Sequence, residues 1–199
     1  MIDYKNYTFE ELGHALYMKG HEIGCRKITD KTGWREKVVA EKLGHQVYKT
    51  ISSGAGTDGE GSDAFDPTSG KRAEYKSQAV ERNDFNNLFQ KTYNRGGKTT
   101  NYVALKMKGV YNNAMKPGAI SKYKNIDHYF GLFYRELCIM IIKVDNDFVV
   151  DSLNEQVYKR RNATSTNLCT VSVSLERGDL YDIVYKNKDW FDKSRLLEG

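Results

Sequence analysis

The sequence predicts a fold of the α/β (α+β) class, in which helices and strands share one core. Three observations indicate it: two amphipathic segments near the N-terminus, a hairpin around a Pro-containing turn, and two short apolar runs in the middle of the chain. With 199 residues, the chain is long enough to bury a core as a single domain, residues 1–199.

The two amphipathic segments are expected to be helices. The first should begin at Thr8, because Thr8 and Glu11 have the spacing of a capping box, and should stop at Gly20. The second should run from about residue 32 to Gly44, a residue type that readily adopts a left-handed cap.

One acid borders the apolar stripe of the second helix. The stripe consists of Trp34, Val38, Val39, Ala40 and Leu43. Glu36 lies beside it, either reaching inward toward a site or remaining solvated opposite lysines, and the sequence leaves both open.

The hairpin over residues 61–78 carries the residues with the most informative spacing. Asp63 precedes a turn, and Glu74 and Lys76 follow it. Side chains two apart on a strand share a face, so Glu74 and Lys76 should lie together while Tyr75 points into the core. We therefore expect Asp63, Glu74 and Lys76 to form one cluster.

This cluster has the composition of a hard-metal site. Mg²⁺ binds through one or two carboxylates plus phosphate oxygens of a substrate. Asp63 and Glu74 would supply the carboxylates, the backbone carbonyl of Tyr75 a further oxygen, and Lys76 a cation that orients water or stabilises negative charge.

The remaining elements are expected as follows. The apolar runs 129–134 and 137–144 should be buried central strands, residues 168–175 a strand with one wet face, and residues 45–50 a short strand. Residues 81–93 and 153–161 have helical spacing, residues 145–147 suggest a turn, and residues 180–199 an amphipathic tail.

Charge is distributed unevenly along this mildly basic chain, whose formal net charge is +5. Residues 85–126 contain no acid but many cations, with tyrosines between them. Such a composition suits phosphate contacts from lysine and arginine, although a merely solubilising basic segment is the alternative.

Several function classes are disfavoured. The cysteines Cys25, Cys138 and Cys169 are odd in number and form no CxxC pair, which argues against a zinc ribbon or a disulfide framework and favours reduced thiols in the cytoplasm. No apolar run is long enough for a membrane span, and no signal peptide is recognisable. The glycine-rich loop 52–62 lacks a phosphate-loop ending, so a nucleotide cofactor is not expected, and the lone His128 is expected to be structural.

At Asp63, Glu74 and Lys76 the chain resembles the PD-(D/E)XK nuclease superfamily, over roughly residues 31–150. The resemblance implies a central mixed β-sheet flanked by helices, a restriction-endonuclease-like core. A basic DNA-contacting insertion would span about 91–126, and C-terminal strands and a tail 151–199.

The resemblance also implies roles for these residues. Asp63 matches the first acid of the family, Glu74 the second, and Lys76 the lysine, while Glu36 matches an additional acid on the first core helix. Family members cleave phosphodiester bonds with Mg²⁺, usually in DNA.

The sequence departs from the family pattern before the turn. Ser62, not proline, precedes Asp63, and it is Asp66 that is followed by a proline. The two acids therefore compete for the metal. We favour Asp63, because an Asx hydrogen bond in the turn would explain Asp66 without a function.

The expected function is a small Mg²⁺-dependent endonuclease acting on double-stranded DNA, most like a type II restriction enzyme working as a homodimer. A nuclease of repair, recombination or phage origin that reads DNA structure, and a non-catalytic DNA-binding protein with a structural acid cluster, are the alternatives. The expected DNA contacts are Gln78, Arg95, Lys98, Lys106, Lys108, Lys116, Lys122, Lys124, Arg160, Arg161 and Arg177.

Overall fold

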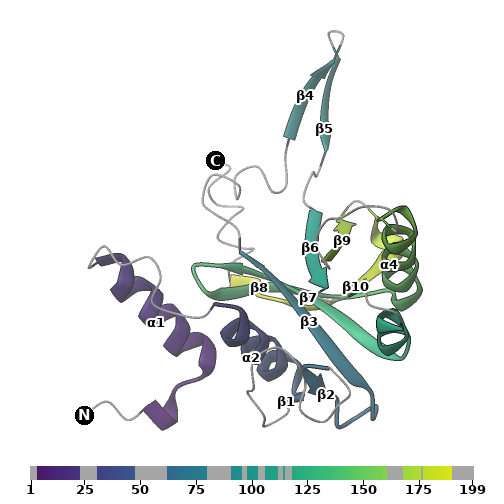
Figure 1. Ribbon diagram of the computed structural model, residues 1–199. Helices are drawn as coiled ribbons and strands as arrows, with labels where there is room; N and C mark the ends of the chain where they lie inside the picture. Colours follow the sequence, from purple (N-terminus) through teal and green to yellow (C-terminus); the bar gives the residue numbers. More distant parts are fainter. Residues whose placement is uncertain are drawn as a thin grey trace.

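Figure 1 shows the computed structural model of the chain, in which helices pack on a central six-stranded sheet. The structure describes residues 4–22, 31–47, 62–79, 91–95, 98–102, 106–111, 114, 118–160, 168–175 and 177–189. The predicted α+β class, with a central mixed sheet flanked by helices, is confirmed.

The central sheet has the order β1-β2-β3-β7-β8-β10. Its strands are β1 (Gln46–Val47), β2 (Ala64–Phe65), β3 (Arg72–Ala79), β7 (Ile126–Tyr134), β8 (Leu137–Val144) and β10 (Tyr181–Lys186). β3 and β7 run parallel, whereas the other neighbouring pairs of this sheet are antiparallel. The two apolar runs are β7 and β8, which are buried as predicted.

Helix α2 (Lys31–Leu43) covers one face of this sheet. The predicted apolar stripe is the buried side of the helix: Val38, Val39 and Ala40 pack in a cluster with residues of β3, β7 and β8. Gly44 has a left-handed φ of 70°, and the N–H of His45 donates to the carbonyl of Ala40 at 2.9 Å. The predicted end of the helix is therefore confirmed as a Schellman cap.

The opposite face carries α4 (Asn146–Arg160) and an antiparallel pair of strands, β6 (Lys106–Tyr111) and β9 (Cys169–Ser174). Met107, Tyr111, Phe130, Val149 and Val171 are members of the larger buried cluster on this side. β9 alternates between buried and more exposed residues, as predicted for a strand with one wet face. The sheet is thus covered on both faces, which explains the nearly continuous apolar sequences of β7 and β8.

Helix α1 (Phe9–Glu22) follows a short 3-10 turn, η1 (Tyr4–Asn6). Its predicted capping box is confirmed, because the N–H of Thr8 donates to Glu11 at 2.8 Å and the N–H of Glu11 donates to the Thr8 hydroxyl at 3.2 Å. The predicted stop at Gly20 is wrong, because Gly20 is helical and α1 continues to Glu22. Glycine lowers helix stability but does not end a helix by itself.

The start of α4 also differs from its prediction. Residues 145–147 are not a free turn, because the carboxylate of Asp145 accepts a hydrogen bond from the N–H of Phe148 at 2.8 Å and caps the helix. α4 therefore begins at Asn146, seven residues before the predicted start at 153. Val149 and Leu153 on this helix are fully buried, so packing stabilises the added turns.

A helix over residues 81–93 is wrong where the structure describes it, because residues 91–93 belong to β4 (Lys91–Arg95). β4 pairs with β5 (Lys98–Tyr102) in an antiparallel hairpin that projects from the body in Figure 1. Gly96-Gly97 between two threonine- and tyrosine-containing segments is a hairpin signal, which the helical spacing of the preceding residues obscured. Residues 80–90 lie outside the described residues.

The C-terminal segment contributes to the central sheet. After a 3-10 turn, η3 (Gly178–Leu180), β10 pairs with β8, where the sequence suggested only an amphipathic tail. Within the expected strand 45–50, residues 46–47 form β1, while residues 48–50 and 190–199 lie outside the described residues. Cys138 and Cys169 are buried and form no disulfide with a described residue, and Cys25 lies outside the described residues.

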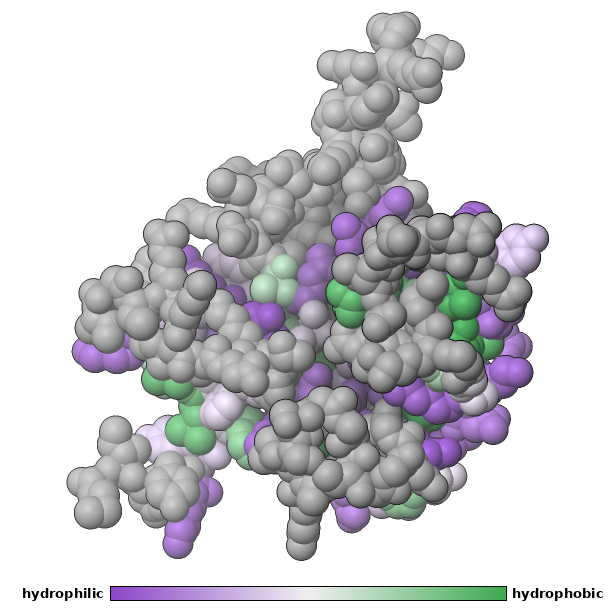
Figure 2. All heavy atoms as spheres, in the orientation of Figure 1, coloured by the Kyte–Doolittle hydropathy of each residue, from purple (hydrophilic) through white to green (hydrophobic). Residues whose placement is uncertain are grey.

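On the face shown in Figure 2, much of the described surface is hydrophilic, with hydrophobic areas near α1 and on the side of α4. Phe9, Leu16 and Met18 on α1 are among the exposed large apolar residues. In the part of the chain that the structure describes, no helix is both long and apolar enough to cross a membrane.

Candidate active site

The hairpin formed by β2 and β3 brings the predicted cluster together. The N–H of Asp63 donates to the carbonyl of Ala73 at 3.0 Å, which closes the hairpin just before β2. The N–H of Tyr75 then donates to Oδ2 of Asp63 at 2.7 Å. The Asp63 carboxylate is thereby held beside the Glu74–Lys76 segment, twelve positions away from Tyr75 in sequence.

Asp66 occupies a different place, in the turn itself. Its Oδ1 accepts a hydrogen bond from the N–H of Thr68 at 2.8 Å, and its Oδ2 accepts one from the hydroxyl of Ser69 at 2.5 Å. The expected Asx hydrogen bond is therefore present. The hydrogen bonds from Ser69 and Thr68 lower the pKa of Asp66, so its carboxylate serves the turn.

Glu74 and Lys76 share one face of β3, as their spacing predicts. Nζ of Lys76 lies 2.5 Å from Oε1 of Glu74, and the two side chains are only 16% and 8% exposed. The other carboxylate oxygen, Oε2 of Glu74, is buried and accepts no hydrogen bond from the described residues. A buried acceptor left without a hydrogen-bond donor costs about 1–3 kcal/mol of folding stability, so this oxygen calls for an explanation.

Tyr75 points to the other side of the sheet, as expected. It is buried in the cluster under α2, and its hydroxyl lies 2.7 Å from Nδ1 of His45. Its backbone remains on the site side through the hydrogen bond to Asp63.

The electrostatics of the cluster follow from its burial. Desolvation and the nearby charge of Glu74 raise the pKa of Asp63 from 3.8 to about 6, against the opposing effects of Lys76 and the Tyr75 N–H. Burial alone would lower the pKa of Lys76. The charges of Glu74, Asp63 and, more weakly, Glu36 outweigh burial and raise it, so Lys76 stays protonated.

Glu36 lies part-buried on α2, at the border of the apolar stripe. Its charge reaches Lys76, because it contributes to the raised pKa of that residue. Of the two alternatives for Glu36, inward toward the site or solvated opposite lysines, this coupling is consistent with the first.

Other residues gather around the cluster that the sequence did not indicate. The ring of Tyr111 on β6 lies 5.0 Å from Nζ of Lys76, and the hydroxyl of Tyr111 lies 3.1 Å from Nδ1 of His128. Gly109 packs on the stem of Lys76. Local sequence gives no signal for these neighbours, because Gly109, Tyr111 and His128 each lie more than thirty positions from Lys76 in the chain.

The chemistry of the donor set fits a divalent cation. Among the described residues, no group of three or more His, Cys, Asp or Glu side chains is placed to hold a metal ion. Mg²⁺ needs only one or two carboxylates when it keeps several waters and binds substrate phosphates. Asp63 and Glu74 are such a pair, and Oε2 of Glu74 is a buried oxygen without a hydrogen-bond donor among the residues that the structure describes.

The predicted DNA contacts lie in several places. Lys106, Lys108, Lys122 and Lys124 are exposed, on β6 and around the 3-10 turn η2 (Ala119–Tyr123). Oε1 of Gln78 accepts a hydrogen bond from the N–H of Lys108 at 2.9 Å, which joins β3 to β6.

The other predicted contacts are less informative. Arg95 and Lys98 face each other in the register of the β4–β5 hairpin, and Arg160 ends α4. Arg177 forms a bidentate pair with Asp179, at 2.9 and 2.7 Å, so its guanidinium is already engaged. Lys116 and Arg161 lie outside the described residues.

No family model matches the chain, and a search of curated proteins finds no relative. The distinguishing feature of the site is two carboxylates and an ammonium group that the β2–β3 hairpin brings together, with one carboxylate oxygen that accepts no hydrogen bond from the described residues.

Proposed function

We propose that the protein is a Mg²⁺-dependent endonuclease that hydrolyses phosphodiester bonds of double-stranded DNA. The observation that carries the proposal is the Asp63–Glu74–Lys76 cluster, in which the pKa of Asp63 is raised and one buried oxygen of Glu74 has no hydrogen-bond donor in the described part of the chain. Two carboxylates held together in a buried site repel each other, and a bound cation would relieve that repulsion.

Asp63 and Glu74 would hold the metal, with the backbone carbonyl of Tyr75 as a further ligand. The bound ion would polarise the phosphate and lower the pKa of a coordinated water. Glu74 holds the ammonium group of Lys76 beside the acids, at 2.5 Å from Oε1. Lys76 would orient the attacking water and stabilise negative charge that develops on the phosphate.

The surroundings support a polyanionic substrate. Lys106 and Lys108 lie exposed on β6, whose buried side packs over Lys76. Lys122, exposed on η2, is close enough for its charge to lower the pKa of Asp63, although burial and Glu74 raise it more. Cations around an acid cluster can hold phosphates of DNA near it and would release counterions on binding.

The order of the residues in space supports the resemblance to PD-(D/E)XK nucleases. The first acid and the Glu-x-Lys residues belong to one hairpin of β2 and β3, inside a mixed sheet with α2 on one face. We infer a sequence-specific restriction enzyme that acts as a homodimer, because cutting both strands symmetrically requires two sites.

A digest of plasmid and of long linear DNA tests the proposal. With Mg²⁺, the protein should convert supercoiled plasmid to nicked and linear forms, and chelation of the metal should stop the reaction. Discrete fragments from the linear DNA support sequence recognition, whereas a smear or junction-specific cutting indicates a nuclease that reads DNA structure. Salt-dependent DNA binding that is indifferent to Mg²⁺, with no cleavage, would show that the cluster is structural.

A further inference from the structure

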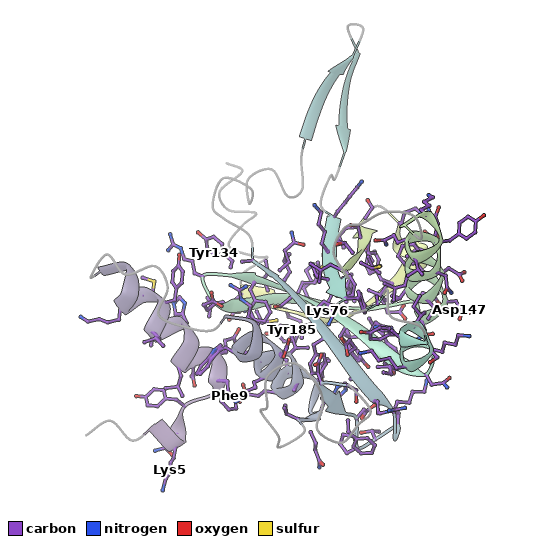
Figure 3. The ribbon with its side chains drawn as sticks, viewed as in Figure 1. Lys5, Phe9, Lys76, Tyr134, Asp147 and Tyr185 are labelled. Carbon is purple, nitrogen blue, oxygen red and sulfur yellow. The ribbon has the colours of Figure 1, made fainter. Side chains whose placement is uncertain are left out.

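Strand β6 packs over the site, and its alternation defines which residues face it. Met107, Gly109 and Tyr111 are buried, whereas Lys106, Lys108 and Val110 are exposed. In Figure 3, Lys76 lies near the centre of the molecule, where Figure 1 shows β3, β6 and β7 close together. β6 thus presents two buried residues, Gly109 and Tyr111, to the side chain of Lys76.

Gly109 leaves room for the stem of Lys76. A Cβ atom at position 109 would lie 2.8 Å from Cγ of Lys76 and 2.7 Å from Cζ of Phe130. Both distances are shorter than real carbon contacts, so any side chain at this position would push Lys76 or Phe130 away. The stem of Lys76 is therefore packed against β6 at Gly109.

Tyr111 contacts the charged end of the same side chain. Its ring centroid lies 5.0 Å from Nζ of Lys76, a distance at which the ring attracts an ammonium group. Oε1 of Glu74 lies 2.5 Å from the same Nζ. The ammonium group therefore contacts both a carboxylate and an aromatic ring.

Tyr111 is in turn held by His128, which occupies the β7 position opposite Glu74 in the parallel register. The carbonyl oxygen of Tyr123 lies 3.2 Å from Nε2 of His128 and can only accept, so Nε2 carries the proton. Burial lowers the pKa of His128, which is therefore neutral, and its Nδ1 accepts a hydrogen bond from the Tyr111 hydroxyl.

The same carbonyl anchors this arrangement to α4. Nδ2 of Asn146 donates to the carbonyl of Tyr123 at 2.9 Å and to that of Ile126 at 2.7 Å. The rings of Tyr111 and Tyr123 meet edge to face with centroids 5.1 Å apart. Tyr111, which contacts Lys76, is thus connected through His128 and Tyr123 to the packed core.

We propose that Gly109, Tyr111 and His128 are positioning residues that fix the Lys76 ammonium group against the Asp63–Glu74 acid pair. The inference rests on the proposed function, in which Lys76 acts on water or phosphate. Lysine has a flexible four-carbon stem, and a misplacement of about 1 Å in an active site can cost about a hundredfold in rate. A packed stem and an aromatic contact restrict that freedom.

Four variants test the proposal in the full-length protein, by single-turnover cleavage of plasmid with Mg²⁺. Gly109→Ala and Tyr111→Leu should each lower the cleavage rate at saturating DNA by about tenfold or more. The DNA concentration that gives half of the maximal rate should stay within about twofold of the wild-type value. Tyr111→Phe keeps the ring and should recover most of the rate that the leucine variant loses. His128→Phe removes both hydrogen bonds of the histidine and should lower the rate about threefold or more.

Tyr129 provides the matched control. It is a buried tyrosine on β7 that belongs to the cluster on the opposite face, and Nζ of Lys143 lies 5.9 Å from its ring centroid. Tyr129→Leu and Tyr129→Phe should leave the cleavage rate per folded molecule unchanged. An equal loss of rate in the Tyr129 variants and the Tyr111 variants would overturn the positioning role.

A readout that needs no activity separates this inference from the proposed function. In NMR spectra of protein labelled on lysine, the methylene signals of Lys76, identified by their loss in Lys76→Arg, should be shifted upfield by the Tyr111 ring. The shift should disappear in Tyr111→Leu and change in Gly109→Ala. If the wild type cleaves no DNA, the proposed function fails, but the NMR shift still tests the positioning role of Gly109 and Tyr111. Unchanged Lys76 signals in both variants would overturn that positioning role.

Discussion

The backbone N–H of Tyr75 donates a hydrogen bond to Oδ2 of Asp63 at 2.7 Å. This bond joins a residue before the hairpin turn to the strand after it, so that Asp63 and Glu74 stay together in a part-buried site. Burial and the nearby charge of Glu74 raise the pKa of Asp63 to about 6, and Oε2 of Glu74 accepts no hydrogen bond from the described residues. The first predictions follow from this pair of acids.

The stability of the metal-free protein should fall as pH rises from about 4 to about 6. The folded-state pKa of Asp63 lies above its unfolded value, so the folded protein binds the additional proton in this window. That stability is present below the unfolded pKa and is lost as pH passes the folded pKa. Denaturant unfolding should show a loss of about 1–3 kcal/mol, which Asp63→Asn removes.

Magnesium should oppose this loss, because the ion competes with the proton for the acid pair. Added Mg²⁺ should raise the melting temperature at about pH 7.5 and have little effect at about pH 5. Asp63→Asn should abolish the shift, whereas Asp66→Asn should retain it. If Asp66→Asn abolishes the shift and Asp63→Asn does not, the assignment of the first acid is wrong.

Lys76→Met should destabilise the metal-free protein by about 3–5 kcal/mol, because it leaves two buried carboxylates without their cation. Mg²⁺ should stabilise this variant more than the wild type, since the ion replaces the lost charge, yet cleavage should remain absent. Thermal melts with and without Mg²⁺ measure this. A smaller Mg²⁺ effect in Lys76→Met than in the wild type would argue against a metal at the acid pair.

The sequence was sufficient where the signals were local. Thr8 and Glu11 close their capping box within one turn, Gly44 caps α2, and the turn at Asp66 aligns Asp63 with Glu74. Each of these features depends on residues that are near one another in the chain.

The sequence failed where partners are distant. From sequence alone, the β10 segment is predicted as an amphipathic tail, because its pairing with β8 has no local signal. The start of α4 depends on burial of Val149 in the core, which also has no local signal. Tyr111 and His128 reach Lys76 only because β6 and β7 pack on β3. A lone histidine and a tyrosine in a basic segment carry no local sign of that contact.

The exposed lysines of β6 should contribute to DNA affinity through phosphates. Lys106→Ala/Lys108→Ala should weaken binding in the absence of Mg²⁺ and reduce the slope of log affinity against log salt by about 2. The control pair is Lys5→Ala/Lys19→Ala, two exposed lysines near the N-terminus, and Figure 3 shows Lys5 far from Lys76. Equal losses for both pairs in fluorescence anisotropy would indicate a general charge effect and not a binding surface.

The buried pair of Arg35 and Glu136 should matter for stability and not for chemistry. The guanidinium donates to both carboxylate oxygens at 2.8 and 2.7 Å, at a β7–β8 turn where Arg135 and Glu136 have positive φ. Glu136→Gln leaves a buried charge unpaired and should cost about 3–5 kcal/mol in urea unfolding. Glu155→Gln, which removes an exposed pair with Lys159, is the control and should leave the midpoint unchanged.

The comparison of wild type and Glu74→Gln in a plasmid cleavage assay tests the central claim most directly. Glutamine keeps the size of the side chain but removes the charge that would hold the metal and pair with Lys76. The account predicts Mg²⁺-dependent conversion of supercoiled to linear plasmid by the wild type, and at least about a hundredfold slower cleavage by Glu74→Gln with DNA binding retained. Equal cleavage by the two proteins, or none by a folded wild type that binds DNA, would contradict it.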